Sequence, residues 1–89
     1  MNIYLSKEPV MTTSKNNEVL YILIFKTNIE LDEDLELVRS HLEKESSVIN
    51  WNVDREDIDK VLRIESRYND TGKIIKKINE AGFFCEELN

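Results

Sequence analysis

Side chains able to bind a soft metal ion or to act as nucleophiles are scarce in this chain, which has one cysteine, Cys85, and one histidine, His41. A free cysteine is among the most buried residue types, and Cys85 lies in an apolar C-terminal segment, so we predict a small core residue. His41 flanks an apolar stripe with helical spacing and has no cysteine or carboxylate at metal-ligand spacing, so we predict a partly exposed helix residue. With Met11, these two side chains are the alternative ligands for a nonstandard metal site.

Carboxylates dominate the remaining chemistry and give the chain a formal charge of −6. Their spacing matches no EF-hand loop, which favours a solvated acidic surface over a calcium site. Such a surface repels phosphate backbones and anionic lipids, so we predict no nucleic-acid or membrane-surface binding. It either recruits a basic partner or merely keeps a small protein soluble. The two acidic clusters are Glu30, Asp32, Glu33, Asp34 and Glu36, and Asp54, Glu56, Asp57 and Asp59.

Motifs for catalysis are absent from the sequence. It has no Gly-x-Gly-x-x-Gly or Walker A loop for phosphate, no Gly-x-Ser-x-Gly nucleophile elbow, and no second histidine to pair with Cys85. We therefore predict a non-catalytic protein without a cofactor. A single cysteine suits a reducing compartment, and we find neither a secretory signal nor a stretch of about 20 apolar residues, so we expect a cytoplasmic location.

Hydrophobic patterning divides the chain into a polar N-terminal segment, residues 1–18, and one domain, residues 19–89. The N-terminal segment lacks periodicity, and we predict a flexible tail or a loosely docked arm. Met11 is an alternative start of the chain, which would make the first ten residues an artefact of gene calling. A chain of 89 residues leaves no room for a second domain.

The domain should contain six elements in the order strand, helix, strand, strand, helix, strand. Strands are indicated by an apolar β-branched run and by alternating segments, helices by apolar stripes at helical spacing, and Gly82 is suited to end the second helix in the left-handed conformation. This order predicts an α+β, ferredoxin-like sandwich, a four-stranded antiparallel sheet with two helices on one face. The predicted elements are residues 19–25, 31–44, 49–54, 60–66, 73–81 and 83 onward.

The first strand is apolar on both of its faces, whereas the helices cover only one face of the predicted sheet. One side-chain set must then lie on the uncovered face unless the N-terminal arm covers it, and an exposed apolar face predicts association with a protein partner or a second copy. Trp51 is most simply a core residue, although tryptophan is also common at binding hot spots. The two sets are Leu20, Ile22 and Ile24, and Tyr21, Leu23 and Phe25; the interaction candidates are Tyr21, Leu23, Phe25 and Trp51.

Several core positions share one pattern: Val38 and Leu42 four apart in a helix, Val48-x-x-Trp51-x-Val53-Asp54, Leu62-x-Ile64, and Ala81-Gly82-Phe83-x-Cys85-x-x-Leu88. Over residues 19–89 this pattern resembles the heavy-metal-associated domains, the ferredoxin-like modules of copper chaperones and metal-transporting ATPases. That family closes with Gly-Tyr-x-Ala-x-x-Leu, so Cys85 stands where it has a small alanine. The matching positions are core positions, which specify shape more than chemistry.

In that family the loop after the first strand carries Gly-Met-x-Cys-x-x-Cys, whose thiolates bind Cu(I) or Zn(II). The resemblance places Ile29 at the methionine, Leu31 at the first cysteine and Asp34 at the second. Neither sulfur is present, so we predict a degenerate site that binds no soft metal. We expect a non-catalytic domain that acts through protein association. The alternative is a metal-handling, copper chaperone-like protein that uses a nonstandard site.

Overall fold

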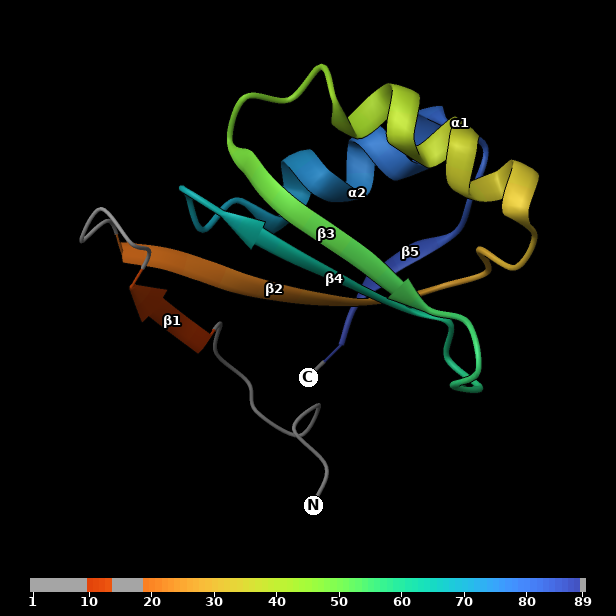
Figure 1. Ribbon diagram of the computed structural model, residues 1–89, viewed down its shortest axis with the longest axis horizontal. Coiled ribbons are helices and arrows are strands. Elements are labelled where there is room, and N and C mark those ends of the chain that lie inside the picture. The colour runs from red at the N-terminus through yellow and green to blue at the C-terminus, as the bar shows by residue number, and fades with distance from the viewer. Residues whose placement is uncertain (1–9, 14–18, 89) are drawn as a thin grey trace.

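The computed structural model describes residues 10–13 and 19–88. Its sheet lies below two helices that run across the same face (Figure 1). The elements are β1 (Val10–Thr13), β2 (Val19–Thr27), α1 (Asp32–Leu42), β3 (Val48–Asp54), β4 (Val61–Ser66), α2 (Thr71–Glu80) and β5 (Cys85–Glu87). From β2 to β5 the order is the predicted β-α-β-β-α-β order, which confirms the ferredoxin-like fold.

All strand pairs are antiparallel, in the order β1-β2-β4-β3, with β5 also paired to β2. β5 covers the β2 edge only from Phe25 to Thr27, and β1 pairs with the same edge from Val19 to Ile22. The sheet therefore has five strands where four were predicted. The additional strand comes from the segment predicted as a tail or arm; its other residues, 1–9 and 14–18, lie outside the described part of the chain.

The core fills the space between the helices and one face of the sheet. It forms because each helix turns its apolar stripe toward alternate side chains of the strands. The buried residues are Leu23, Phe25, Ile29, Val38, Leu42, Leu62, Ile64, Ile74, Ile78 and Cys85.

Local capping fixes the position of α2. The Asp70 carboxylate accepts the N–H of Lys73 at 3.1 Å and begins the helix. At the other end Gly82 has φ 101°, which confirms the predicted left-handed conformation. The N–H of Gly82 donates to the carbonyl of Asn79 at 2.9 Å and that of Phe83 to the carbonyl of Ile78 at 3.1 Å, which is the Schellman arrangement.

The structure corrects the expected roles of the two β2 side-chain sets. Leu23 and Phe25, predicted as interaction residues, are 2% and 0% exposed beneath the helices, so the prediction is wrong for them. Leu20 and Ile22 lie on the opposite face, yet each is only 4% exposed within the single chain. The predicted bare apolar sheet face is therefore absent around these two residues, and it gives no reason for association.

Candidate functional site

The loop between β2 and α1 is the place where the resembling family holds its metal, and here its backbone amides donate hydrogen bonds to side chains of β2 and of α1. Ile29 is 0% exposed and belongs to the core. Leu31 occupies the N-cap position of α1 and is half exposed. The Asp34 carboxylate reaches back to accept the N–H of Glu30 at 3.1 Å and of Leu31 at 2.9 Å. These three side chains thus provide a core anchor, an exposed apolar group and a helix cap, which is not a ligand set for a soft cation.

Further hydrogen bonds tie this loop to its neighbours. The Thr27 hydroxyl donates to the carbonyl of Lys60 at 2.6 Å and accepts the N–H of Ile29 at 3.2 Å. The Asn28 side chain accepts the N–H of Phe84 at 2.9 Å. These hydrogen bonds hold the loop between the β3–β4 hairpin and the residues just before β5.

Ion pairs cross between the loop and the hairpin. Arg55 donates to the Asp32 carboxylate at 2.8 Å and to the carbonyl of Glu30 at 3.1 Å. The Lys60 ammonium lies 3.6 Å from the Glu30 carboxylate. Lys26 approaches Asp59 at 3.7 Å. Both acidic clusters predicted from the sequence are thereby brought to one end of the molecule, at the right of Figure 1.

We call residues 26–36 and 54–60 the acidic end. It contains nine carboxylates and three cations, Lys26, Arg55 and Lys60, a balance of −6. This equals the net charge of the whole chain, so all other residues together are formally neutral. The asymmetry produces a directed field at this end rather than a uniformly acidic surface.

The alternative metal ligands do not come together. Cys85 is 7% exposed in the core, and burial raises the pKa of its thiol to about 12, so the thiolate that a metal requires is disfavoured. The Nδ1 of His41 lies 2.9 Å from the carbonyl oxygen of Leu37 and 3.3 Å from the Ser40 hydroxyl, so the contacts of this nitrogen are local to α1. In residues 10–13 and 19–88 no group of three or more His, Cys, Asp or Glu side chains could hold a metal ion. Met11 lies in β1, and its side chain is not described.

Trp51, the remaining interaction candidate, lines a groove between α1 and β3. It packs partly against the core, and the Arg39 guanidinium lies 5.8 Å from the centre of its ring. The groove has a volume of about 340 Å³ and is lined by Leu35, Val53, Arg55 and Asn50 as well. Tyr21 also packs partly against the core, on the helix-covered face.

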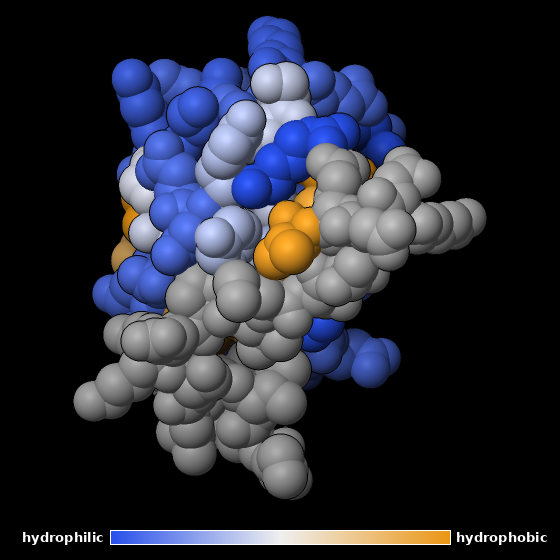
Figure 2. Space-filling view, turned by 90° about the vertical axis from the view of Figure 1, so that its left-hand side faces the viewer, coloured by the Kyte–Doolittle hydropathy of each residue, from blue (hydrophilic) through white to orange (hydrophobic). Residues whose placement is uncertain are grey.

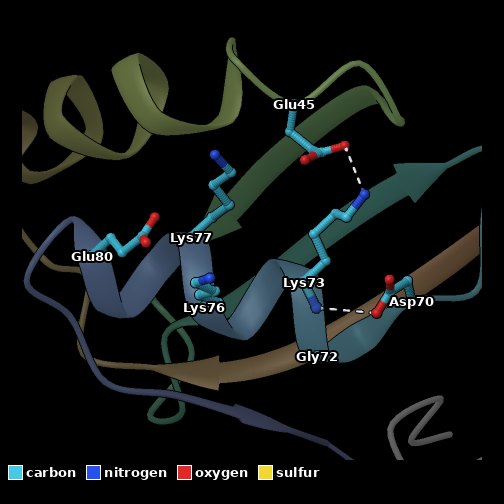
Figure 3. Close-up of a pocket in the computed structure, with 7 residues that line it drawn as sticks. All are labelled: Glu45, Asp70, Gly72, Lys73, Lys76, Lys77 and Glu80. Atoms are coloured by element: carbon cyan, nitrogen blue, oxygen red, sulfur yellow. Dashed lines mark hydrogen bonds and ion pairs between the residues drawn. The ribbon is translucent and has the colours of Figure 1, made fainter.

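A second hollow, which sequence analysis missed, lies along α2 and has a volume of about 480 Å³ (Figure 3). Lys73, Lys76 and Lys77 line it, and their spacing of three and four residues on a helix was the available signal. Lys73 pairs with Glu45 at 3.6 Å. The pKa of Glu45 is lowered chiefly by the hydrogen bond from the Ser47 hydroxyl, against the opposing effect of burial. Because three carboxylates, Glu45, Asp70 and Glu80, also line the hollow, its charges balance and it offers no net attraction for an anion.

The end opposite the acidic end is largely hydrophilic, with only small hydrophobic areas visible beside atoms drawn in grey (Figure 2). None of the helices in the described residues is long and apolar enough to cross a membrane.

Comparisons with known proteins connect this fold to copper proteins. No protein-family description and no curated protein sequence matches the chain. Among solved structures it is similar to the Cu(I)-loaded first domain of the human copper chaperone for SOD1, with a TM-score of 0.65, 16% identity, and coverage of 76% of this chain and 92% of that one. For the yeast copper transporter domain Ccc2a the TM-score is 0.64 and the identity 14%, with coverage of 76% of this chain and 94% of that one. For the apo heavy-metal-associated domain of a copper chaperone for superoxide dismutase the TM-score is 0.67 and the identity 16%, with coverage of 94% of this chain and 84% of that one.

These similarities show that the chain has the fold of heavy-metal-associated domains. At identities of 14–16%, these similarities are evidence for the fold and not for a shared function. The predicted resemblance is confirmed at this level, and the single cysteine of the chain agrees with a missing pair of thiolate ligands.

Proposed function

We propose that this protein is a non-catalytic association domain that binds a basic protein surface through its acidic end and needs no metal to do so. The observation that carries the proposal is the Asp34 carboxylate, which caps α1 through the amides of Glu30 and Leu31 at the place of a family thiolate. The chain thus has the fold of a metal carrier, but the side chains of this loop serve structure and surface charge.

The charge distribution supports a basic partner. Electrostatic complementarity raises the rate of encounter and suppresses partners of like charge, more than it adds affinity. Most of the acidic side chains at this end are exposed, for example Glu33 and Glu56, which make no side-chain hydrogen bond or ion pair among those found in the described residues. Such side chains are free to meet lysine and arginine residues of another protein.

The alternative function is metal handling at a nonstandard site, which the copper-protein structures of the same fold favour. Burial of Cys85 weighs against it, as does the lack, in residues 10–13 and 19–88, of any group of three or more His, Cys, Asp or Glu side chains that could hold a metal ion. Titration of the purified apo-protein with Cu(I) and with Zn(II), while the reactivity of Cys85 is followed, separates the two functions. We expect no stoichiometric binding tighter than micromolar; such binding would favour the alternative.

Association is tested by affinity capture from extracts of the source organism with identification of the bound proteins. We expect the captured partner to present lysine and arginine residues and to be released as salt rises, because exposed charges are screened over about 8 Å at physiological ionic strength. The double variant Glu33→Lys and Glu56→Lys should lose the partner. Glu80→Lys, which makes the same kind of charge change on α2, should retain it. Equal capture by both variants would contradict a role for the acidic end.

A further inference from the structure

The groove between α1 and β3, which we call the α1–β3 groove, lies beside a free sheet edge. β3 is the last strand in the order β1-β2-β4-β3, so one of its edges has no partner strand in the described chain. A β-strand edge with a helix beside it is the arrangement in which one protein adds an extended segment of another as an extra strand. Main-chain hydrogen bonds then supply affinity, and alternate side chains of the segment enter the neighbouring groove.

The Trp51 amide hydrogen-bonds to an oxygen that is not part of a neighbouring strand. Its N–H donates to the side-chain oxygen of the preceding residue, Asn50, at 2.9 Å. The Asn50 amide nitrogen in turn donates to Glu65 at 3.3 Å. An adjacent irregularity of the β3–β4 register lies between Val48 and Asn50. The Asn50 oxygen therefore occupies a place on the edge that the carbonyl of an added strand would take, and it protects the edge while no partner is bound.

The side chains of the groove define what the added strand should carry. Leu35, Trp51 and Val53 provide an apolar floor that is only partly buried in the chain alone. Arg39 and Arg55 also line the groove, and their side chains are 55% and 36% exposed, respectively. Tryptophan and arginine are the residue types most enriched at binding hot spots.

Both guanidinium groups can exchange their present partners. Arg39 pairs with Glu36 at 3.1 Å and Arg55 with Asp32 at 2.8 Å, but the side chains of Glu36 and Asp32 are 69% and 93% exposed. Exposed ion pairs contribute little to stability, and each guanidinium has further N–H donors for a carboxylate.

The geometry points to a peptide-binding site: an extended segment of a partner protein adds to β3 and places an apolar side chain on Trp51, with flanking Asp or Glu side chains on Arg39 and Arg55. This site borders the acidic end, which contributes Leu35 and Arg55 to it, and it recognises carboxylates only through the two guanidinium groups. It goes beyond the proposed function. Its failure leaves the binding of a basic partner at Glu33 and Glu56 untouched.

The test is selection of a phage-displayed library of random dodecapeptides on the full-length protein, followed by titration of synthetic copies of the selected peptides. We expect an aliphatic or aromatic residue with Asp or Glu within two positions of it. Arg39→Glu and Trp51→Ala should each weaken binding about tenfold or more, and bound peptide should slow hydrogen exchange at the amides of Trp51 and Val53. Asn50→Ala should bind more tightly, because it removes the group that the peptide must displace.

A control variant separates loss of the site from a general effect of charge. Lys76→Glu makes the same charge change as Arg39→Glu but lies on α2, and it should leave affinity within about threefold of the wild-type value, as expected for an exposed charge away from the site. Arg39→Glu guards against the case in which Trp51→Ala loses binding by unfolding. The site is overturned if no peptide is enriched, or if Arg39→Glu and Lys76→Glu bind alike. It is also overturned if sedimentation shows a dimer in which the amides of Trp51 and Val53 are already protected from hydrogen exchange without peptide.

Discussion

The Cys85 thiol shows how one residue can lose the chemistry of its side chain through its surroundings. It lies in β5, paired opposite Thr27, and is 7% exposed. A cysteine at this position fills space as the family alanine would, and burial opposes formation of its thiolate. We therefore regard Cys85 as a structural residue.

This burial predicts a loss of stability at alkaline pH. The folded-state pKa of about 12 lies above the ordinary value of 9.0, so the unfolded chain releases this proton first, and the thiol's contribution is complete below pH 9 and lost as pH rises from 9 to 12. The expected slope is on the order of 1 kcal/mol per pH unit in that window. Urea unfolding of the wild type and of Cys85→Ala at pH 7, 9 and 11 measures it. All other groups are common to the two proteins, so identical pH profiles would show that the thiol is already accessible in the fold.

The two glycines of the chain allow the cost of a left-handed backbone conformation to be compared with that of an ordinary helical one. Gly82 has φ 101° and nothing within 4 Å of an added Cβ, so Gly82→Ala should cost about 1–2 kcal/mol through the backbone conformation alone. Gly72 lies in the first turn of α2 without a positive φ, and an added Cβ would meet only the Asp70 carboxylate at 3.7 Å. Gly72→Ala should therefore be neutral or stabilising by up to about 0.5 kcal/mol. Chemical denaturation measures both; equal effects would contradict the left-handed helix end.

At the scale of elements, local patterns were sufficient to predict the fold. Helical stripes and alternating strands gave six elements whose bounds shift by at most a few residues, because each element places an apolar face on one core. The Schellman end of α2 followed from Gly82. By contrast, β1 was not predicted as a strand, since Val10–Thr13 has no alternation and gains its structure from the β2 edge that β5 leaves open.

Site features that depend on tertiary contacts were harder to predict. The sequence could not decide which β2 side chains meet the helices, because both sets are apolar, and the interaction role assigned to Leu23 and Phe25 was wrong. The absence of thiolates at Leu31 and Asp34 was visible in the sequence, whereas the capping role of Asp34 appeared only with the backbone. The sequence likewise could not show that the two acidic clusters lie at the same end of the molecule, because the β3–β4 hairpin brings them together.

The β2–α1 loop should regain metal binding if its sulfurs are restored. Leu31→Cys with Asp34→Cys creates a Cys-x-x-Cys spacing at the start of α1, where the positive end of the helix dipole favours thiolates. We expect stoichiometric Cu(I) binding by the double variant and none by the wild type. Loss of the Asp34 hydrogen bonds should cost the apo form about 1 kcal/mol. Competition with a Cu(I) chelator measures the affinity, and the two single-cysteine variants serve as controls. A double variant that folds but binds no more Cu(I) than these controls would mean that this loop lacks the geometry of the copper proteins with the same fold.

At the scale of the whole molecule, charge and edge protection decide how the protein meets others. The net charge is gathered at one end, and the two sheet edges are treated differently. Asn50 protects the β3 edge through a side chain, whereas the β2 edge is covered by two short strands, β1 and β5. Edges that are long, apolar and uncovered promote self-association.

Removal of β1 should therefore promote self-association. Deletion of residues 1–13 leaves the main chain of Val19–Ile22 unpaired on one side, beside apolar side chains such as Leu20, and Val19 is already 54% exposed. Sedimentation velocity at several concentrations should show a monomer for the full chain and a concentration-dependent dimer for the deletion variant. Adding Val19→Lys to the deletion places a charge at an exposed position beside the open edge and should restore the monomer. A deletion variant that stays monomeric with an unchanged free energy of unfolding would mean that β1 contributes nothing to the sheet.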